Sequence, residues 1–209
     1  MTVTPERILS VFATPIVNTQ LEDFVAHNDA LATHIRACAK ATIGVARSNV
    51  GGWHSSNDFL SQGHPAVIAL RAEIQRAVQT LSKIVARDPE DERHAQFQLE
   101  GWANLAKFGQ YHSLHSHPNA CWSGVYYVTG NPEAPPEYPL SGRLELIDPR
   151  PGASLSYADH TVLYGRFLVN PSPGQMVLFP GWLQHVVHPY FGDEERITVA
   201  FNASFPEGS

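Results

Sequence analysis

The hydrophobic pattern of the first part of the chain predicts two amphipathic helices. Residues 21–41 (LEDFVAHNDALATHIRACAKA) place apolar side chains close to the helical period of about 3.6 residues, which gives the helix one apolar face. A second stripe of this kind begins at Pro65, a residue that suits the first turn of a helix, and ends near Asp88. The apolar, partly β-branched residues 8–14 predict a short opening strand. Residues 44–57, which contain a pair of glycines, predict a loop between the helices.

After about residue 95 the pattern changes to short apolar runs that alternate with Gly and Pro. These runs are rich in β-branched and aromatic residues, and they predict strands at residues 96–108, 111–117, 122–129, 142–147, 161–169, 175–179, 184–188 and 196–205. Strands of this number and spacing favour a barrel or jelly roll. The Pro-rich residues 131–139 and residues 148–159 predict long surface loops, of the kind that shape a substrate entrance.

The two patterns together predict a mainly β protein with flanking helices. We expect a jelly-roll or cupin-like barrel at residues 95–209, buttressed on one outer face by the opening strand and helices of residues 1–94. No convincing linker separates these two parts. We therefore expect residues 1–209 to form a single domain, as β-barrels of this length commonly do.

Composition narrows the class of protein. The chain is 43 % hydrophobic and 16 % charged, which is typical of a folded protein with a sizeable core. Its formal net charge is −6 and it contains no run of Lys and Arg, so nothing indicates a nucleic-acid partner. No apolar stretch reaches the roughly 18 residues of a membrane-spanning helix, and Cys38 and Cys121 alone do not indicate a disulfide framework. We expect a soluble, cytoplasmic protein that acts on a small-molecule or peptide substrate, without a membrane partner.

Histidine is the residue type that stands out. Of the 11 histidines, His112, His115 and His117 lie within six residues. Because alternate side chains of a strand share a face, His115 and His117 can hold one metal ion from a single strand. A third ligand must come from elsewhere, and His185, directly after a predicted turn, is a better candidate than His188, which would face the opposite way.

A second set of polar residues follows on the last predicted strand. Arg196 and Thr198 share one face of that strand, and both would point inward if Val199 packs against the outer layer. A guanidinium group can bind a carboxylate through two hydrogen bonds, and a neighbouring hydroxyl can add a third. The alternative is that Arg196 pairs with Glu194 or Glu195 on the surface.

Three segments in the β half carry a resemblance to a known family. The segments YHSLHSHPNACWSGVYYV, GRLELIDPR and GQMVLFPGWLQHVVHPYFGDEERITVAFN resemble a bacterial group of 2-oxoglutarate/Fe(II)-dependent oxygenases. That group is identified by a pattern of the form H-x-H-P, SGVYY, DPR, FP, L-x-H-x-V and R-I-S/T-x-A-F-N. The resemblance covers roughly residues 95–205 and implies a double-stranded β-helix fold, in agreement with the strand pattern.

The resemblance also implies roles for particular residues. His115 and His185 correspond to the two histidines of a metal-binding facial triad, and Arg196 and Thr198 to the residues that hold the distal carboxylate of 2-oxoglutarate. His117 stands where the superfamily usually has Asp or Glu. Three neutral imidazoles leave the site one charge more positive than two imidazoles and a carboxylate, which should strengthen binding of an anionic chelator.

Two further residues are expected beside the co-substrate. Tyr126 and Tyr127 alternate along a predicted strand, so one of them lines the barrel interior. The pattern leaves open which one, and Tyr127 is named as the candidate. Asn104, on an adjoining strand, is expected to reach the same space. For both residues, packing without a role in binding is the alternative.

The expected function is that of a non-haem Fe(II)/2-oxoglutarate-dependent dioxygenase, which hydroxylates its substrate and releases succinate and CO2. The alternatives are a cupin-like three-histidine dioxygenase or isomerase that does not use 2-oxoglutarate, and a metal- or ligand-binding module without enzymatic activity. A zinc hydrolase is a weaker alternative, because no Asp or Glu lies near the histidines in sequence to act as a general base. A homodimer is common for barrels of this kind and is compatible with the sequence.

Overall fold

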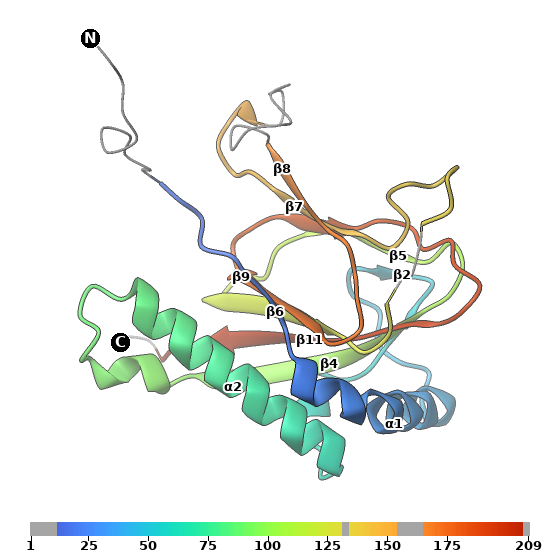
Figure 1. Ribbon diagram of the computed structural model, residues 1–209, viewed down its shortest axis with the longest axis horizontal. Coiled ribbons are helices and arrows are strands. Elements are labelled where there is room, and N and C mark those ends of the chain that lie inside the picture. Colours follow the sequence, from blue (N-terminus) through green and yellow to red (C-terminus); the bar gives the residue numbers. More distant parts are fainter. Residues whose placement is uncertain (1–11, 131–133, 154–164, 207–209) are drawn as a thin grey trace.

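The computed structural model describes residues 12–130, 134–153 and 165–206. Two antiparallel sheets face each other, and two helices cover the outer face of the larger sheet (Figure 1). In spatial order, the larger sheet contains β1 (Val17–Gln20), β9 (Gln175–Pro180), β6 (Trp122–Tyr127), β11 (Arg196–Ser204), β4 (Gln98–Ala106) and β3 (Trp53–His54). The smaller sheet contains β2 (Asn49–Val50), β5 (Tyr111–His115), β10 (His185–Val187), β7 (Leu144–Ile147) and β8 (Arg166–Val169).

The helical layer forms as the apolar stripes predict. A 3₁₀ helix (Glu22–His27) leads into α1 (Asn28–Ala41), so the single predicted helix at 21–41 begins with a tighter turn. Helix α2 (Pro65–Val85) begins at the predicted proline, and the side chain of His64 caps it by accepting a hydrogen bond from the backbone of Ala66. Two short 3₁₀ helices, Phe59–Ser61 and Glu92–Ala95, flank α2.

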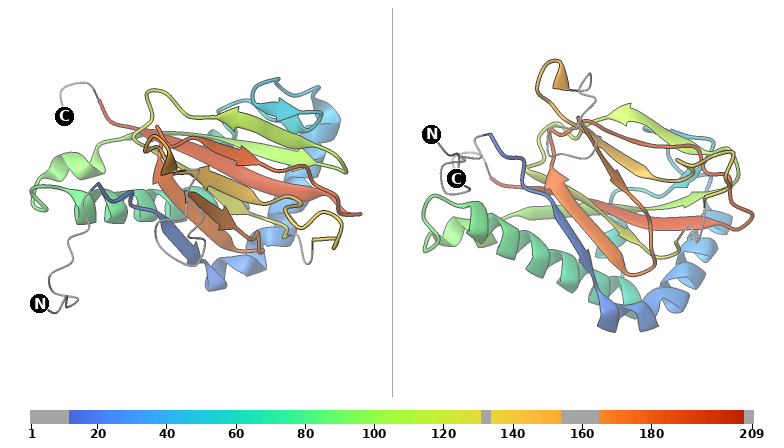
Figure 2. Two further views of the ribbon diagram at one scale, coloured as in Figure 1. Left: turned by 90° about the horizontal axis from the view of Figure 1, so that it is seen from above. Right: turned by 45° about the horizontal axis from the view of Figure 1, so that its top comes forward.

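Alternation along β11 decides what each face of the larger sheet contacts. Its odd-numbered residues, Ile197, Val199, Phe201 and Ala203, are fully buried in a core that they share with apolar residues of α1 and α2. The even-numbered residues face the smaller sheet, and three of them, Arg196, Thr198 and Ala200, line a cavity there. The right-hand view in Figure 2 shows this order of layers, with helices on one side of β11 and the smaller sheet on the other.

Several predicted elements differ from the structure at their ends. The predicted opening strand at 8–14 is wrong where it can be compared: residues 8–11 lie outside the described residues, residues 12–14 form no strand, and the first strand is β1. Strand β1 begins after Pro15, at Val17, which pairs with Leu178 of β9. The predicted loop at 44–57 contains β2 and β3, two-residue strands that form only by pairing with β5 and β4.

The described strands otherwise follow the expected order, and the mainly β architecture with flanking helices is confirmed. Residues 161–164 of one predicted strand lie outside the described residues, and β8 occupies the remainder of that strand from Arg166. Within the described part of the chain, no helix combines the length and apolar character needed to cross a membrane.

Candidate metal centre

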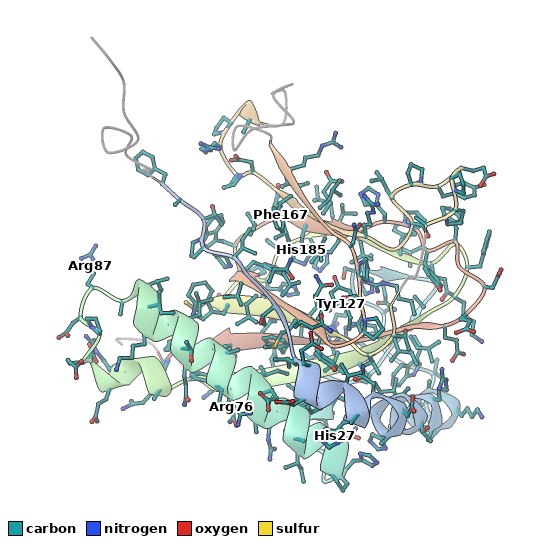
Figure 3. The ribbon with its side chains drawn as sticks, viewed as in Figure 1. His27, Arg76, Arg87, Tyr127, Phe167 and His185 are labelled. Atoms are coloured by element: carbon teal, nitrogen blue, oxygen red, sulfur yellow. The ribbon has the colours of Figure 1, made fainter. Side chains whose placement is uncertain are left out.

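Three histidines meet between the two sheets. His115 ends β5, His185 begins β10, and His117 lies two residues beyond the end of β5. Each offers one nitrogen, and these three nitrogens lie within 4.8 Å of one another. The ring centroids are 4.2 Å apart for His115 and His185, and 5.0 Å and 5.2 Å from these two rings to that of His117. Figure 3 shows His185, together with Tyr127, in the space between the sheets.

Backbone pairing brings the three residues together. His115 and His185 are direct partners in the antiparallel pairing of β5 and β10. The backbone N–H of His117 donates to the carbonyl oxygen of Gly181 at 2.8 Å, which holds the loop after β5 against the turn after β9. Gly181 is required there, because a Cβ atom would lie 2.3 Å from the carbonyl oxygen of Ala120. The structure brings the three histidines together, but His117 is placed by this turn and not by strand alternation.

Two of the rings are held in a form suited to metal binding. Nδ1 of His115 is 2.7 Å from the carbonyl oxygen of Ser113, and Nδ1 of His185 is 2.9 Å from that of Leu183. A carbonyl oxygen can only accept, so each Nδ1 carries the proton. Nε2 of both rings therefore presents its lone pair to the space that the three histidines share.

His117 has a different partner. Its Nδ1 is 3.4 Å from Nδ2 of Asn202, a longer contact than those of the other two rings. Asn202 is oriented by Ser123, which donates to its Oδ1 at 2.7 Å, and by Glu100, whose Oε1 accepts from Nδ2 at 3.2 Å. A carboxylate thus lies behind His117, separated from it by one amide group.

Burial keeps all three imidazoles neutral. Removal from water, followed by repulsion from the neighbouring ring of His115, lowers the pKa of His117 to about 4 and that of His185 to about 3. The pKa of His115 is also lowered, mainly by burial. At physiological pH each ring therefore offers a lone pair, which is the state that binds a metal ion.

Arg196 lies at another part of the same cavity. Its side chain is buried, with 2 % of the residue exposed, and its Cζ atom lies 5.5 Å from the ring centroid of Tyr127. Among the described residues no carboxylate forms an ion pair with it. Glu195 instead contacts Arg36 at 2.8 Å and Lys107 at 3.5 Å on the surface. Arg196 therefore points inward and does not pair with Glu195, and its role in binding a carboxylate stays a prediction.

Several polar atoms around Arg196 lack a hydrogen bond of normal geometry, although Tyr127 and the guanidinium group lie close enough to influence each other's pKa. In the described residues four buried side-chain nitrogen or oxygen atoms have no hydrogen-bond partner, and three of them, Nε of Arg196, Oη of Tyr127 and Oδ1 of Asn104, belong to residues that line this cavity. Thr198 accepts a weak hydrogen bond from Nδ2 of Asn104 at 3.4 Å. Because folded proteins rarely leave buried polar groups unpaired, this cluster is suited to a polar ligand. A carboxylate fits its donors and its positive charge.

The cavity has two polar residues that sequence reasoning did not assign, Ser48 and His112. A β-bulge brings His112 inward: His115 pairs with His185, but His112 pairs with Val187, so β5 spans three residues where β10 spans two. The clustering of histidines was a signal for His112, whereas strict alternation hid its orientation. Ser48 lies in the stretch expected to be a loop, and no sequence signal identified it.

One family matches the chain. Residues 100–202 match a family described as "Putative 2OG-Fe(II) oxygenase", in which 2OG denotes 2-oxoglutarate. The comparison with curated proteins gave no match.

Solved structures share the fold at low sequence identity. A prolyl-4-hydroxylase from Pseudomonas putida is 16 % identical with a TM-score of 0.61, over 92 % of this chain and 94 % of that one. HygX from Streptomyces hygroscopicus, with nickel and 2-oxoglutarate bound, is 11 % identical with a TM-score of 0.60, over 99 % and 89 %. A prolyl hydroxylase from Trichoplax adhaerens, in complex with a peptide fragment of hypoxia inducible factor, is 11 % identical with a TM-score of 0.60, over 91 % and 83 %.

These likenesses concern the fold, and they confirm the expected double-stranded β-helix. The sequence match goes beyond the fold. The matched residues 100–202 include the three clustered histidines and Arg196. Residues 100–202, just under half of the chain, therefore match the 2OG-Fe(II) oxygenase family.

Proposed function

We propose that this oxygenase hydroxylates a small-molecule or peptide substrate, with Fe(II) held by His115, His117 and His185 and 2-oxoglutarate held by Arg196. The observation that carries the proposal is the convergence in one cavity of three neutral imidazoles and a buried, carboxylate-free guanidinium group. These are the two chemical requirements of a site that binds a metal ion and a dicarboxylate side by side.

The donor set fits iron but is not exclusive to it. Imidazole suits iron, zinc, copper and nickel, and three protein ligands on one side of an ion leave coordination positions open. When bound, iron(II) supplies the activation of dioxygen, coupled to oxidative decarboxylation of 2-oxoglutarate to succinate and CO2. The chain's own contribution is to hold Nε2 of His115 and His185 in place through the carbonyl groups of Ser113 and Leu183.

At the other end of the cavity, Arg196 supplies the charge that balances the distal carboxylate of the co-substrate. Thr198 adds a hydroxyl group on the same face of β11. Tyr127 and Asn104 complete the set with polar atoms that have no partner within the described residues. Because all four side chains are buried, water competes weakly for these contacts, and the co-substrate is oriented before the substrate arrives.

The class of substrate is proposed from relatives of the same fold. One solved structure contains a peptide fragment, and a second structure of HygX contains hygromycin B together with nickel and 2-oxoglutarate. These ligands belong to those proteins. For this chain we propose hydroxylation of a C–H bond in a peptide or small molecule that reaches the metal side of the cavity.

A second candidate rests on the absence of Asp or Glu from the three clustered residues. A cupin-like three-histidine enzyme would use the same metal ligands without 2-oxoglutarate, and Arg196 would then have no co-substrate to bind. The two functions differ in whether 2-oxoglutarate binds to the metal-loaded protein.

The decisive experiment uses protein loaded with Fe(II) under anaerobic conditions and titrated with 2-oxoglutarate. We expect saturable binding by calorimetry, a visible charge-transfer absorption band, and succinate formation after oxygen is admitted. Protein without metal is the control and should give none of these signals. Full iron loading without 2-oxoglutarate binding would contradict the proposal and favour the three-histidine alternative.

A further inference from the structure

Ser48 stands between two histidines of the cavity. Its Oγ atom is 3.2 Å from Nδ1 of His112 and 3.3 Å from Nε2 of His115. Nδ1 of His115 donates to a backbone carbonyl, so the Nε2 atom that faces Ser48 is an acceptor. A serine hydroxyl has one proton, and it can donate to only one of the two rings at a time. Which ring receives this proton therefore depends on whether a metal ion occupies Nε2 of His115.

We propose that His112 is a further binding residue for 2-oxoglutarate, and that Ser48 sets it as a hydrogen-bond donor when metal occupies the histidine cluster. With Nε2 of His115 taken by a metal ion, the hydroxyl proton of Ser48 is left to Nδ1 of His112. The ring of His112 then carries its own proton on Nε2. This N–H group donates to a carboxylate of the co-substrate. The inference rests on the proposed function, because it adds a contact to the same co-substrate.

The surroundings of His112 favour an anion. It lines the cavity, and its one hydrogen bond among the described residues is the contact of Nδ1 with Ser48, so Nε2 is available to a ligand. Burial, and then the positive charge of Arg196, lower the pKa of His112 to about 3. The ring is thus a neutral donor that lies within the field of a guanidinium group. An anion gains from both groups, whereas a cation would be repelled by Arg196.

Affinity for 2-oxoglutarate in the nickel-loaded protein tests the contact without turnover. His112→Phe keeps a ring of similar size but removes both nitrogens, and His112→Gln places an amide N–H group close to the position of Nε2. We expect His112→Phe to weaken binding about ten-fold or more, since hydrogen bonds to charged groups are lost. His112→Gln should recover most of the affinity. Nickel affinity should stay within about two-fold in both variants.

His188→Gln is the matched control. His188 follows β10 in the neighbourhood of the same sheet, but its Nε2 contacts Glu145 at 2.7 Å, and it does not line the cavity. This variant should bind 2-oxoglutarate as the unmodified chain does. Thermal unfolding of every variant establishes that it is folded before its affinity is compared.

The role of Ser48 has a spectroscopic signature. In protein labelled with ¹⁵N-histidine, the two ring nitrogens of His112 should show the Nε2-protonated tautomer once zinc is added, and this change should be absent in Ser48→Ala. A merely structural serine would leave the tautomer of His112 unaffected by metal.

The outcomes separate this inference from the function on which it rests. If His112→Phe binds 2-oxoglutarate within about two-fold of the unmodified chain, His112 makes no contact with it and the inference fails alone. Loss of nickel together with 2-oxoglutarate would make His112 a metal ligand, which also overturns it. If the unmodified, nickel-loaded chain binds no 2-oxoglutarate, the proposed function fails and the inference fails with it.

Discussion

Glu195 and Arg196 are adjacent in sequence, yet their charged groups lie in different environments. The carboxylate of Glu195 contacts Nε of Arg36 at 2.8 Å, with 29 % of its side chain exposed. Arg196 is 2 % exposed and lines the cavity between the sheets. The two oppositely charged side chains therefore point in different directions where β11 begins. The guanidinium group is left for a ligand. The pair also supplies a matched experiment.

Arg196→Ala should weaken 2-oxoglutarate binding while metal content stays the same. The expected loss is on the order of 2–5 kcal/mol, by analogy with removal of one partner from a buried charge pair. Glu195→Gln, one residue earlier, should leave the affinity unchanged because its contacts are on the surface. Calorimetry on the metal-loaded proteins measures both. A change of less than about ten-fold in Arg196→Ala would argue against its role as an anchor.

Tyr126 and Tyr127 should respond in opposite ways to replacement by Phe. The hydroxyl of Tyr126 donates to Oδ1 of Asn28 at 2.6 Å inside the core, so Tyr126→Phe should destabilise the fold by about 1–3 kcal/mol. The hydroxyl of Tyr127 has no partner in the described residues, so Tyr127→Phe should not reduce the stability of the ligand-free protein.

Affinity for 2-oxoglutarate should show the reverse order for the two tyrosines. Tyr127→Phe should weaken binding, by about ten-fold if its hydroxyl contacts a carboxylate, and Tyr126→Phe should not. Urea unfolding and calorimetry, applied to both variants, provide the two measurements. Equal effects of the two variants on affinity would mean that Tyr127 does not contact the co-substrate.

His117 tests the all-histidine metal centre. His117→Ala removes one of three ligands and should lower iron stoichiometry, whereas His117→Asp supplies a carboxylate and should retain iron. The added negative charge should make 2-oxoglutarate bind somewhat less tightly in His117→Asp. Iron content and succinate production, measured side by side, decide the matter. Full iron and full activity in His117→Ala would exclude His117 as a ligand.

The stability of the metal-free protein should fall as the pH is lowered from 7 to 5. In the folded protein the pKa of His112 and of His185 is about 3 and that of His117 about 4, below the ordinary value of 6.5. Between these values the unfolded chain binds protons that the folded chain does not. Protonation therefore favours unfolding, by up to about 1.4 kcal/mol per pH unit for each histidine.

From about pH 7.5 upward these groups bind almost no protons in either state, so they should add no pH dependence to stability there. Denaturant unfolding at several pH values gives the slope. His185→Asn removes one such histidine. It should reduce the pH dependence of the free energy of unfolding by the contribution of one proton. A stability that is unchanged between pH 7 and 5 would contradict the low pKa values.

The order of the described elements and the choice of His115 and His185 could be predicted from the sequence, because each rests on local pattern. Apolar stripes predict the helices α1 and α2. Alternation along β11 predicts that Val199 faces the core and that Thr198 faces the opposite side, where the cavity lies. His115 and His185 were identified by sequence position, and their pairing across β5 and β10 then follows from the fold.

What could not be predicted depends on contacts distant in sequence. The bulge in β5 that turns His112 inward exists only in its pairing with β10. Ser48 reaches the cavity because β2 adds to the edge of β5, and two residues of strand leave no periodic signal. His117 was expected within the strand at residues 111–117, but it lies beyond the end of β5, where its backbone N–H donates to the carbonyl oxygen of Gly181.

The position of β11 within the larger sheet has a consequence for how the protein opens. This strand has nine residues and is hydrogen-bonded to β4 on one side and β6 on the other. By contrast β10, which begins at His185 and lies between β5 and β7, has only three residues. Amide hydrogens of β11 should therefore exchange with solvent far more slowly than those of β10 and of the loop at His117. Local fluctuations would release the metal ligands while Arg196 and Thr198 stay in place. The protein should accordingly lose its metal before it loses its fold, and regain it without refolding.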